Sequence, residues 1–305
     1  MKAREASPLY GLALVVALSM LWGLNWPAMK VALAELPPLT FRALMLGFGG
    51  PGLLLVVRLS GYSIRIPPGH FWNLVQVAMT LIVIWMILSI YGLRLISSGN
   101  AAILAYSMPA WTALFGVWLL GERMTVRRAL GLAAGLGGIA VLVSRDLSAF
   151  GGSLAGPALM VAAAIVWSYG VVLQKSKSWA MPSAAVAGWQ VTLGAIPMTA
   201  LAALLESPDF TGLSDVVWAS VAFNVFGIAI VAYIIWYKVI ALYPVTVASV
   251  GILLTPVLGV ILGAWMLGES VGWREVAALA LIMAAIILVM FERAPERAPQ
   301  PAVGE

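Results

Sequence analysis

Long apolar stretches, each about the length of a membrane-crossing helix, follow one another along the whole chain. Only a few polar, proline or glycine residues separate them, and their hydrophobic positions lack the period-two alternation of barrel strands. A helix needs ~20 residues to cross the hydrocarbon core of a bilayer. Ten stretches come close to this length, at residues 9–33, 39–59, 71–93, 99–120, 126–143, 154–173, 184–205, 216–242, 247–267 and 273–291. The pattern predicts an all-α polytopic membrane protein with ten transmembrane helices.

The second half of the chain repeats the first. Adding 147 to the residue number superimposes matching residues, the pairs being Pro109 and Pro256, Gly116 and Gly263, Trp118 and Trp265, Gly121 and Gly268, and Glu122 and Glu269. Weaker matches, such as Trp22 with Trp167 and Lys30 with Lys175, need a shift of 145. Such self-similarity indicates a duplicated unit. We therefore expect two five-helix repeats, at residues 9–143 and 154–291. Because five is odd, the second repeat must be inverted relative to the first.

The lysines and arginines in the short loops predict the orientation. If the N-terminus is cytoplasmic, 12 of the 17 bases lie inside, and the five outside are Lys30, Arg42, Arg94, Arg145 and Arg274. This excess is typical of cytoplasmic loops, so we expect both termini to be cytoplasmic in a multi-pass protein of the cell (inner, cytoplasmic) membrane. Residues 9–33 are too long for the 7–15 residue core of a signal peptide, which indicates an uncleaved first helix. Residues 292–305 are expected to form a disordered cytoplasmic tail.

Composition agrees with a bilayer as the surroundings. Hydrophobic residues make up 63% of the chain and charged residues 10%, and the mean hydropathy is +1.03. The net charge of +5 is explained by the orienting bases, so nucleic acid is not an expected partner. The absence of cysteine excludes disulfides and thiolate metal sites.

Several motifs together resemble a known transporter family. They are a Trp-Gly pair at residues 22–23, Gly-Asn-Ala-Ala at 99–102, a proline in the middle of a span, and a Gly-Glu-Arg close at 121–123 that returns as Gly-Glu-Ser at 268–270. The chain resembles the EamA branch of the drug/metabolite transporter (DMT) superfamily, in its ten-helix form. The resemblance implies an exporter or facilitator of small metabolites, often amino acids or related compounds, with a central cavity between two halves.

The acidic residues argue against proton coupling through a buried carboxylate. All 12 lie in tails, loops or the ends of the apolar stretches, whereas an acid inside the membrane is a usual sign of a proton pathway. This distribution favours a facilitator, or a form of coupling that the sequence does not reveal. The lone histidine, His70, is expected in a loop. With no nucleophile beside a base and no group of metal ligands, we predict no enzyme activity, no catalytic residue, no metal and no cofactor.

Aromatic and amide side chains near the middle of the stretches are the candidates for substrate binding. Such groups need polar partners in hydrocarbon, and a substrate cavity would supply them, although many could equally serve packing. The candidates are Trp22, Asn25, Trp85, Tyr106, Trp167 and Gln190. Their mixture of ring faces and amides suits an amino acid or an aromatic metabolite better than a sugar phosphate.

Pro109 and Pro256 are expected to kink their helices and to act in gating, because each removes one helical hydrogen bond. The alternative is a tolerated kink that a neighbouring helix satisfies. Glu122 and Glu269 are expected to be structural acids at helix ends.

The expected function is therefore transport of an amino acid or related compound by alternating access. The alternatives are a drug, nucleoside or other metabolite permease, an intramembrane enzyme, and a non-transporting membrane receptor. The expected partners are the small-molecule substrate and the lipid bilayer. A monomer is compatible with the sequence, which leaves the oligomeric state open.

Overall fold

The structure is a computed structural model that describes residues 8–122, 124–144, 153–242 and 245–290. Within these ranges the chain forms helices and short links and no strand. Eight segments are long and apolar enough to cross a membrane. The protein is therefore an all-helical, multi-pass membrane protein. The tail expected at residues 292–305 lies outside the described residues.

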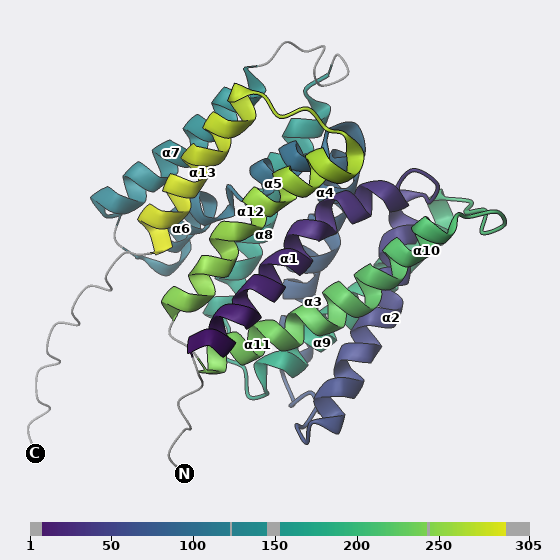
Figure 1. Cartoon of the computed structure of the whole chain (residues 1–305). Helices are drawn as coiled ribbons and strands as arrows, with labels where there is room; N and C mark the ends of the chain where they lie inside the picture. The colour runs from purple at the N-terminus through teal and green to yellow at the C-terminus, as the bar shows by residue number, and fades with distance from the viewer. Residues whose placement is uncertain (1–7, 123, 145–152, 243–244, 291–305) are drawn as a thin grey trace, which may run out of the picture.

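The first half of the chain begins at the purple end of Figure 1 and contains six α-helices and one π-helix before α7 closes it. The elements are α1 (Pro8–Ala32), α2 (Pro38–Leu59), α3 (Phe71–Ala78), η1 (Met79–Ile84), α4 (Trp85–Leu95), α5 (Ser98–Ala105), α6 (Met108–Leu120) and α7 (Val126–Val143). The second half contains α8 (Ala155–Ser176), α9 (Ser183–Leu205), α10 (Asp215–Ala222), η3 (Phe223–Ala232), α11 (Tyr233–Leu242), α12 (Val245–Leu267) and α13 (Trp273–Met290).

Three of the predicted spans are not uniform α-helices. The third, α3–η1–α4, has a π-helical turn in its middle, and the eighth, α10–η3–α11, has a longer one. The fourth is interrupted between α5 and α6. The hydrophobic pattern alone does not distinguish a π-helical segment from an α-helix, since the two bury similar side chains when their composition is similar. Mid-helix π-turns are frequent at functional sites.

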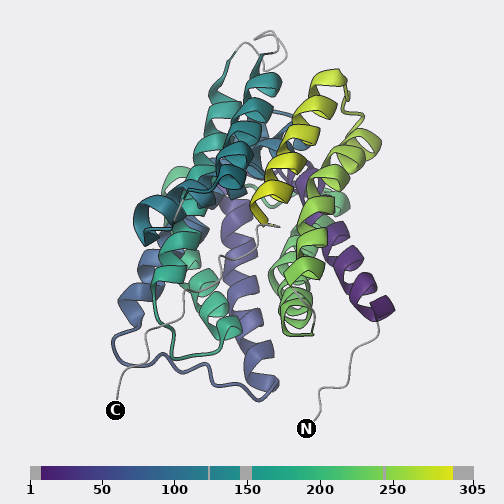
Figure 2. The same ribbon diagram turned by 90° about the vertical axis from the view of Figure 1, so that its left-hand side faces the viewer.

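Helices of the two halves pack against each other in matching pairs. The second span of one half, α2, packs on its counterpart α9, and α7 packs on α13. The pair α1–α12 similarly corresponds to the pair α8–α6. In Figure 1, α7 lies beside α13 and α1 beside α12, and Figure 2 shows that the helices run along roughly one common direction. The interface between the halves therefore extends through the molecule.

Close helix approach in this interface depends on glycine. A Cβ on Gly50 of α2 would lie 2.7 Å from the backbone nitrogen of Thr192 in α9, and one on Gly188 of α9 would lie 2.7 Å from Leu54. Small residues let two backbones approach in a bilayer, where apolar side chains gain little by leaving lipid. The largest buried apolar cluster also joins the halves, because Phe41 and Ile90 pack in it with Val221.

Candidate transport site

The six residues predicted to bind substrate lie on five membrane segments. All are partly exposed within the fold except Gln190, which is 4% exposed. Trp22 and Asn25 lie on α1, Trp85 opens α4, Tyr106 lies in the break after α5, Trp167 lies on α8, and Gln190 lies on α9. Their placement on both halves is compatible with a shared cavity.

The contacts of these residues are local. The Trp22 ring lies 5.7 Å from that of Trp236, at an angle of 48°. The Gln190 Nε2 donates to Gln174 Oε1 at 3.1 Å. The Asn25 Oδ1 is buried and has no hydrogen-bond partner among the described residues. Trp22 and Gln190 thus contact different neighbours, and the convergence of the six residues on one substrate stays a prediction.

The fourth span breaks at Tyr106, and the break contacts the twelfth α-helix. Pro109 lies in the first turn of α6, where its missing N–H costs no hydrogen bond, while Pro256 lies inside α12. The Tyr106 hydroxyl forms a hydrogen bond with the side chain of Thr255, the residue before Pro256. Ser107 closes α5 by donating its hydroxyl to the Leu104 oxygen at 2.7 Å. The two repeated prolines thus lie in different backbone settings, and one side-chain contact joins the residues Tyr106 and Thr255 near them.

The repeated Gly-Glu closes have the same backbone geometry. Gly121 and Gly268 have positive φ angles of 67° and 64°, which glycine tolerates at the end of a helix. The next amide reaches back to the same position of each helix, the bonds being Glu122 N to Gly116 O (3.2 Å) and Glu269 N to Gly263 O (3.5 Å). The local sequence therefore places the two glutamates in equivalent backbone positions, and only their partners in other helices differ.

Glu269 binds the first turn of α5. Its carboxylate accepts from Ser98 N at 2.6 Å, Ser98 Oγ at 2.9 Å and Gly99 N at 3.0 Å. A carboxylate is favourable there because the first amides of a helix lack intrahelical partners and carry partial positive charge. Lys30 is close enough to interact electrostatically with Glu269, and its Nζ donates to Leu93 O at 2.7 Å and to Ile96 O at 2.5 Å.

Two further glutamates cap helices at the same end of the bundle, which we name the Ser98 end. Glu206, directly after α9, accepts from Leu39 N at 2.9 Å and from Thr40 N and Oγ1 at 2.7 and 2.8 Å, at the start of α2. Glu35 accepts from Ser214 N at 2.8 Å and Oγ at 2.7 Å, at the start of α10. Each of the three glutamates joins the first half of the chain to the second.

The opposite end, which we name the Lys175 end, has an ion pair in the equivalent place. Lys175 Nζ lies 2.9 Å from Glu122 Oε1, and Arg128 Nη1 lies 2.9 Å from Glu122 Oε2. The hydrogen bond from Lys175, with the charges of Lys175 and Arg128, lowers the pKa of Glu122 from its usual value. Trp189 Nε1 also donates to Ile64 O at 2.7 Å across the halves. His70, in the loop before α3 as expected, accepts from Ala180 N at 3.3 Å.

Buried polar groups other than the six predicted substrate residues lie nearer the Ser98 end. Arg42 is 3% exposed, and Asn224, which the sequence places inside an apolar span, is fully buried. Among the described residues, Arg42 Nε, Asn224 Oδ1 and Asn100 Oδ1 have no hydrogen-bond partner. An arginine inside an apolar stretch was the available signal for Arg42, since such residues are costly in a membrane and mark functional sites.

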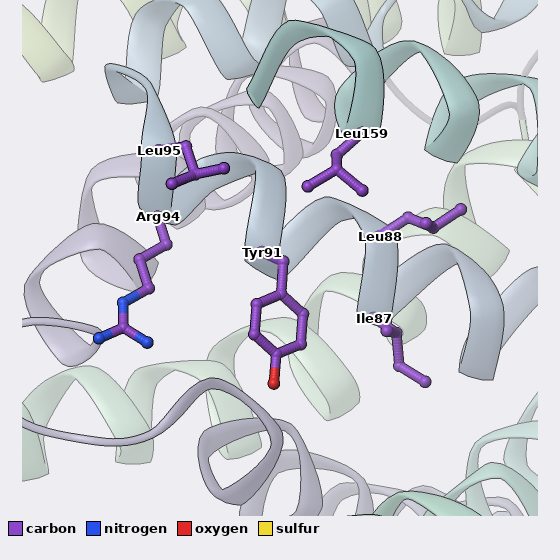
Figure 3. A pocket seen from close by; sticks show the side chains of 6 residues that line it. All are labelled: Ile87, Leu88, Tyr91, Arg94, Leu95 and Leu159. Carbon is purple, nitrogen blue, oxygen red and sulfur yellow. The ribbon is translucent and has the colours of Figure 1, made fainter. Parts of the chain in front are cut away.

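An apolar groove of about 360 Å³ lies between α4 and α8 (Figure 3). Its lining is Ile87, Leu88, Tyr91, Arg94, Leu95 and Leu159. Ser89 lies two residues from both Ile87 and Tyr91, so it faces away from the groove. None of the six predicted substrate residues lines this groove, and we do not assign it to substrate.

The fold and these contacts define a multi-pass helical membrane protein whose two halves are tied together at both ends. The family model of the EamA-like transporter family matches residues 9–144 and 154–291. The chain belongs to this family, which confirms the resemblance deduced from the sequence. Its function class is membrane transport.

Relatives match along nearly the whole chain. It is 24% identical over 279 residues to the uncharacterized transporter YoaV of Bacillus subtilis, covering 91% of this chain and 95% of the relative. It is 27% identical over 298 residues to a probable amino-acid metabolite efflux pump of Salmonella typhimurium, covering 92% and 94%. A crystal structure that is 24% identical superimposes with a TM-score of 0.64 over 92% of this chain and 96% of the other, which supports the fold alone.

Proposed function

We propose that this protein moves an amino acid or a related small metabolite across the cytoplasmic membrane. Movement occurs by alternating access between two inverted five-helix repeats, residues 9–143 and 154–291. Two relatives named as probable amino-acid metabolite efflux pumps, at 27% and 25% identity, support the substrate class. The aromatic and amide side chains Trp22, Asn25, Trp85, Tyr106, Trp167 and Gln190 line the pathway.

One observation supports the proposal: at each end of the bundle, a glutamate of one half lies next to a lysine of the other half. Glu269 of the second half lies by Lys30 of the first, and Glu122 of the first half pairs with Lys175 of the second. The same shifts that align the sequence repeats, 147 for the glutamates and 145 for the lysines, interchange these two pairs. An inverted duplication, with α12 and α13 as the ninth and tenth spans, accounts for this exchange.

With both termini cytoplasmic, the Ser98 end is external. Its three carboxylate caps then close the external side, and the Lys175 end faces the cytoplasm. Opening the external side requires the caps of Glu35, Glu206 and Glu269 to release their helices. The break at Pro109 and the proline of α12, joined through Tyr106 and Thr255, are the proposed bending points for that movement.

The test is flux through purified protein in vesicles. Labelled leucine, phenylalanine and related amino acids should equilibrate across vesicles that contain the protein, without an imposed pH gradient, and protein-free vesicles should show no such flux. Uptake of none of them, with flux of a sugar phosphate or nucleoside instead, would refute the substrate class. Binding without flux would indicate a receptor, and a chemically altered product would indicate an enzyme.

A further inference from the structure

Arg42 is a buried cation that pairs with no carboxylate in the part of the chain that the structure describes. It lies just over one turn into α2 and is 3% exposed. Its Nη2 is 3.4 Å from Ser89 Oγ and its Nη1 is 3.6 Å from the sulfur of Met45, both weak neutral contacts. Its Nε has no partner in the described part of the chain. Most of the hydrogen-bonding capacity of this guanidinium is therefore unused.

The carboxylate that caps the start of α2 is already occupied. Glu206 accepts from Leu39 N, Thr40 N and Thr40 Oγ1, and it forms no ion pair with Arg42 in the described structure. Burying a charge without a counter-ion costs several kcal/mol, and replacement by an apolar residue would avoid that cost. The cost becomes reasonable where a ligand provides the missing negative charge.

The position of Arg42 places it between the two halves. Arg42 and Gly49 are two turns apart and share one face of α2, and a Cβ on Gly49 would collide with Ala229 of η3. On the other side, Ser89 lies on α4, with Trp85 one turn away on the same face. Arg42 thus lies where α2 meets the two spans that contain π-helices.

Unpaired acceptors lie on the neighbouring helices. Asn224 Oδ1 on η3 and Asn25 Oδ1 on α1 are both buried without a hydrogen-bond partner among the described residues. Ser220 Oγ donates to Ala28 O and holds these two segments together. Asn224 is one turn after Ser220 and Asn25 is about one turn before Ala28, so the two amides lie at a similar depth where the helices run antiparallel. One unused cationic donor and two unused acceptors match the two charged groups of a zwitterion.

We propose that Arg42 binds the carboxylate of the transported amino acid, and that the side-chain oxygens of Asn25 and Asn224 accept from its ammonium group. This inference rests on the proposed function, because it assigns the substrate groups recognised at the same pathway. Arginine suits the role since its planar fork can bind both oxygens of a carboxylate. A monoanion needs only one arginine, which agrees with Arg42 as the single base that is buried among the described residues.

The experiment compares each amino acid with its amide, which keeps the ammonium and loses the carboxylate. Flux of leucine against leucinamide, and of phenylalanine against phenylalaninamide, is measured in vesicles that contain the unaltered protein, Arg42→Met, Arg42→Lys or the control Arg94→Gln. Arg94 is an exposed base on α4, and because it follows Ser89 by five residues the two lie on different faces of the helix. The unaltered protein and the control should prefer the acid by at least about tenfold. Arg42→Met should carry acid and amide equally, and Arg42→Lys should keep only part of the preference.

Equal flux of acid and amide through the unaltered protein would overturn the role of Arg42 but would leave amino-acid transport supported. This comparison does not depend on the folding of any variant. A preference that survives in Arg42→Met would also overturn the role of Arg42. Flux of neither acids nor amides through the unaltered protein would instead refute the proposed function, and with it this assignment. Thermal unfolding provides a second measure: leucine should raise the Tm of the unaltered protein, and the shift should vanish in Arg42→Met.

Discussion

Ser98 donates both its backbone amide, at 2.6 Å, and its hydroxyl, at 2.9 Å, to Glu269, a residue 171 positions away in the other half of the chain. This contact fixes the start of α5 to the end of α12. The bonds of Glu206 with Thr40 and of Glu35 with Ser214 fix two further helix starts in the same way. Together they hold the two halves against each other at the Ser98 end, and the proposed alternating access requires these contacts to open in each transport cycle.

Gly263 should be required for the contacts of Glu269 with Ser98. A Cβ at Gly263 would lie 2.6 Å from Glu269 Oε2 and 2.5 Å from Ser98 Oγ, so Gly263→Ala should displace the carboxylate from α5. We expect a stability loss of about 1–3 kcal/mol, typical of overpacking, measured by thermal unfolding in detergent. The control is Gly47→Ala in α2, where a Cβ would have no neighbour within 4 Å and where alanine should be neutral or stabilising. Equal behaviour of the two variants would show that Glu269 is not held as described.

The central tryptophans should matter for flux and the peripheral ones should not. Trp22→Ala and Trp167→Ala should each reduce amino-acid flux by roughly five- to thirtyfold, the equivalent of about 1–2 kcal/mol of lost contact. Trp265→Ala is the control, because that side chain is 80% exposed and lies at a span end. Protein levels in the membrane should stay unchanged. An effect of Trp265→Ala as large as that of the other two would contradict the assignment of Trp22 and Trp167 to the substrate pathway.

Stability should depend on pH through Glu122. The Lys175 hydrogen bond and nearby positive charges lower its pKa in the folded protein below the ordinary 4.5. The stabilisation is therefore present above about pH 4.5 and is lost as the pH falls through the folded-state pKa. The Tm difference between the unaltered protein and Glu122→Gln should shrink on acidification below pH 4.5. Lys175→Met should lose most of this dependence, while Lys177→Met should keep it, since Lys177 bonds the neutral Gln76.

The topology can be tested with paired reporters. Alkaline phosphatase fused after Glu305 should be inactive and a fluorescent protein fused there should fluoresce, because the C-terminus is expected in the cytoplasm. An insertion within residues 145–152 should give the reverse result. Phosphatase activity at Glu305 would place the Ser98 end in the cytoplasm. The carboxylate caps would then close the cytoplasmic side rather than the external side.

Local pattern predicted more of the fold than of the site. Span length and repeat spacing were enough for the helical membrane class, and the Gly121 and Gly268 closes follow from sequence because they involve neighbouring residues only. The partners of Glu269, Glu206 and Glu35 could not be predicted, since each lies more than 160 positions away and depends on how the halves pack. The sequence also did not predict the break in the fourth span or the π-helices, because their hydrophobic pattern resembles that of an uninterrupted helix.

The most direct test of alternating access is the accessibility of single cysteines at the two ends. The chain has no cysteine of its own, so Ala101→Cys, one turn into α5, and Val172→Cys, near the Lys175 end, can each be labelled selectively. Both side chains are at most 2% exposed in this structure. Adding Glu269→Gln should speed the labelling of residue 101 about tenfold and slow that of residue 172, because opening one end closes the other. Asp209→Asn is the control and should change neither rate, because the hydrogen bonds described for the Asp209 carboxylate are with Thr211, two residues away. Faster labelling at both positions, or no change at either, would contradict the account.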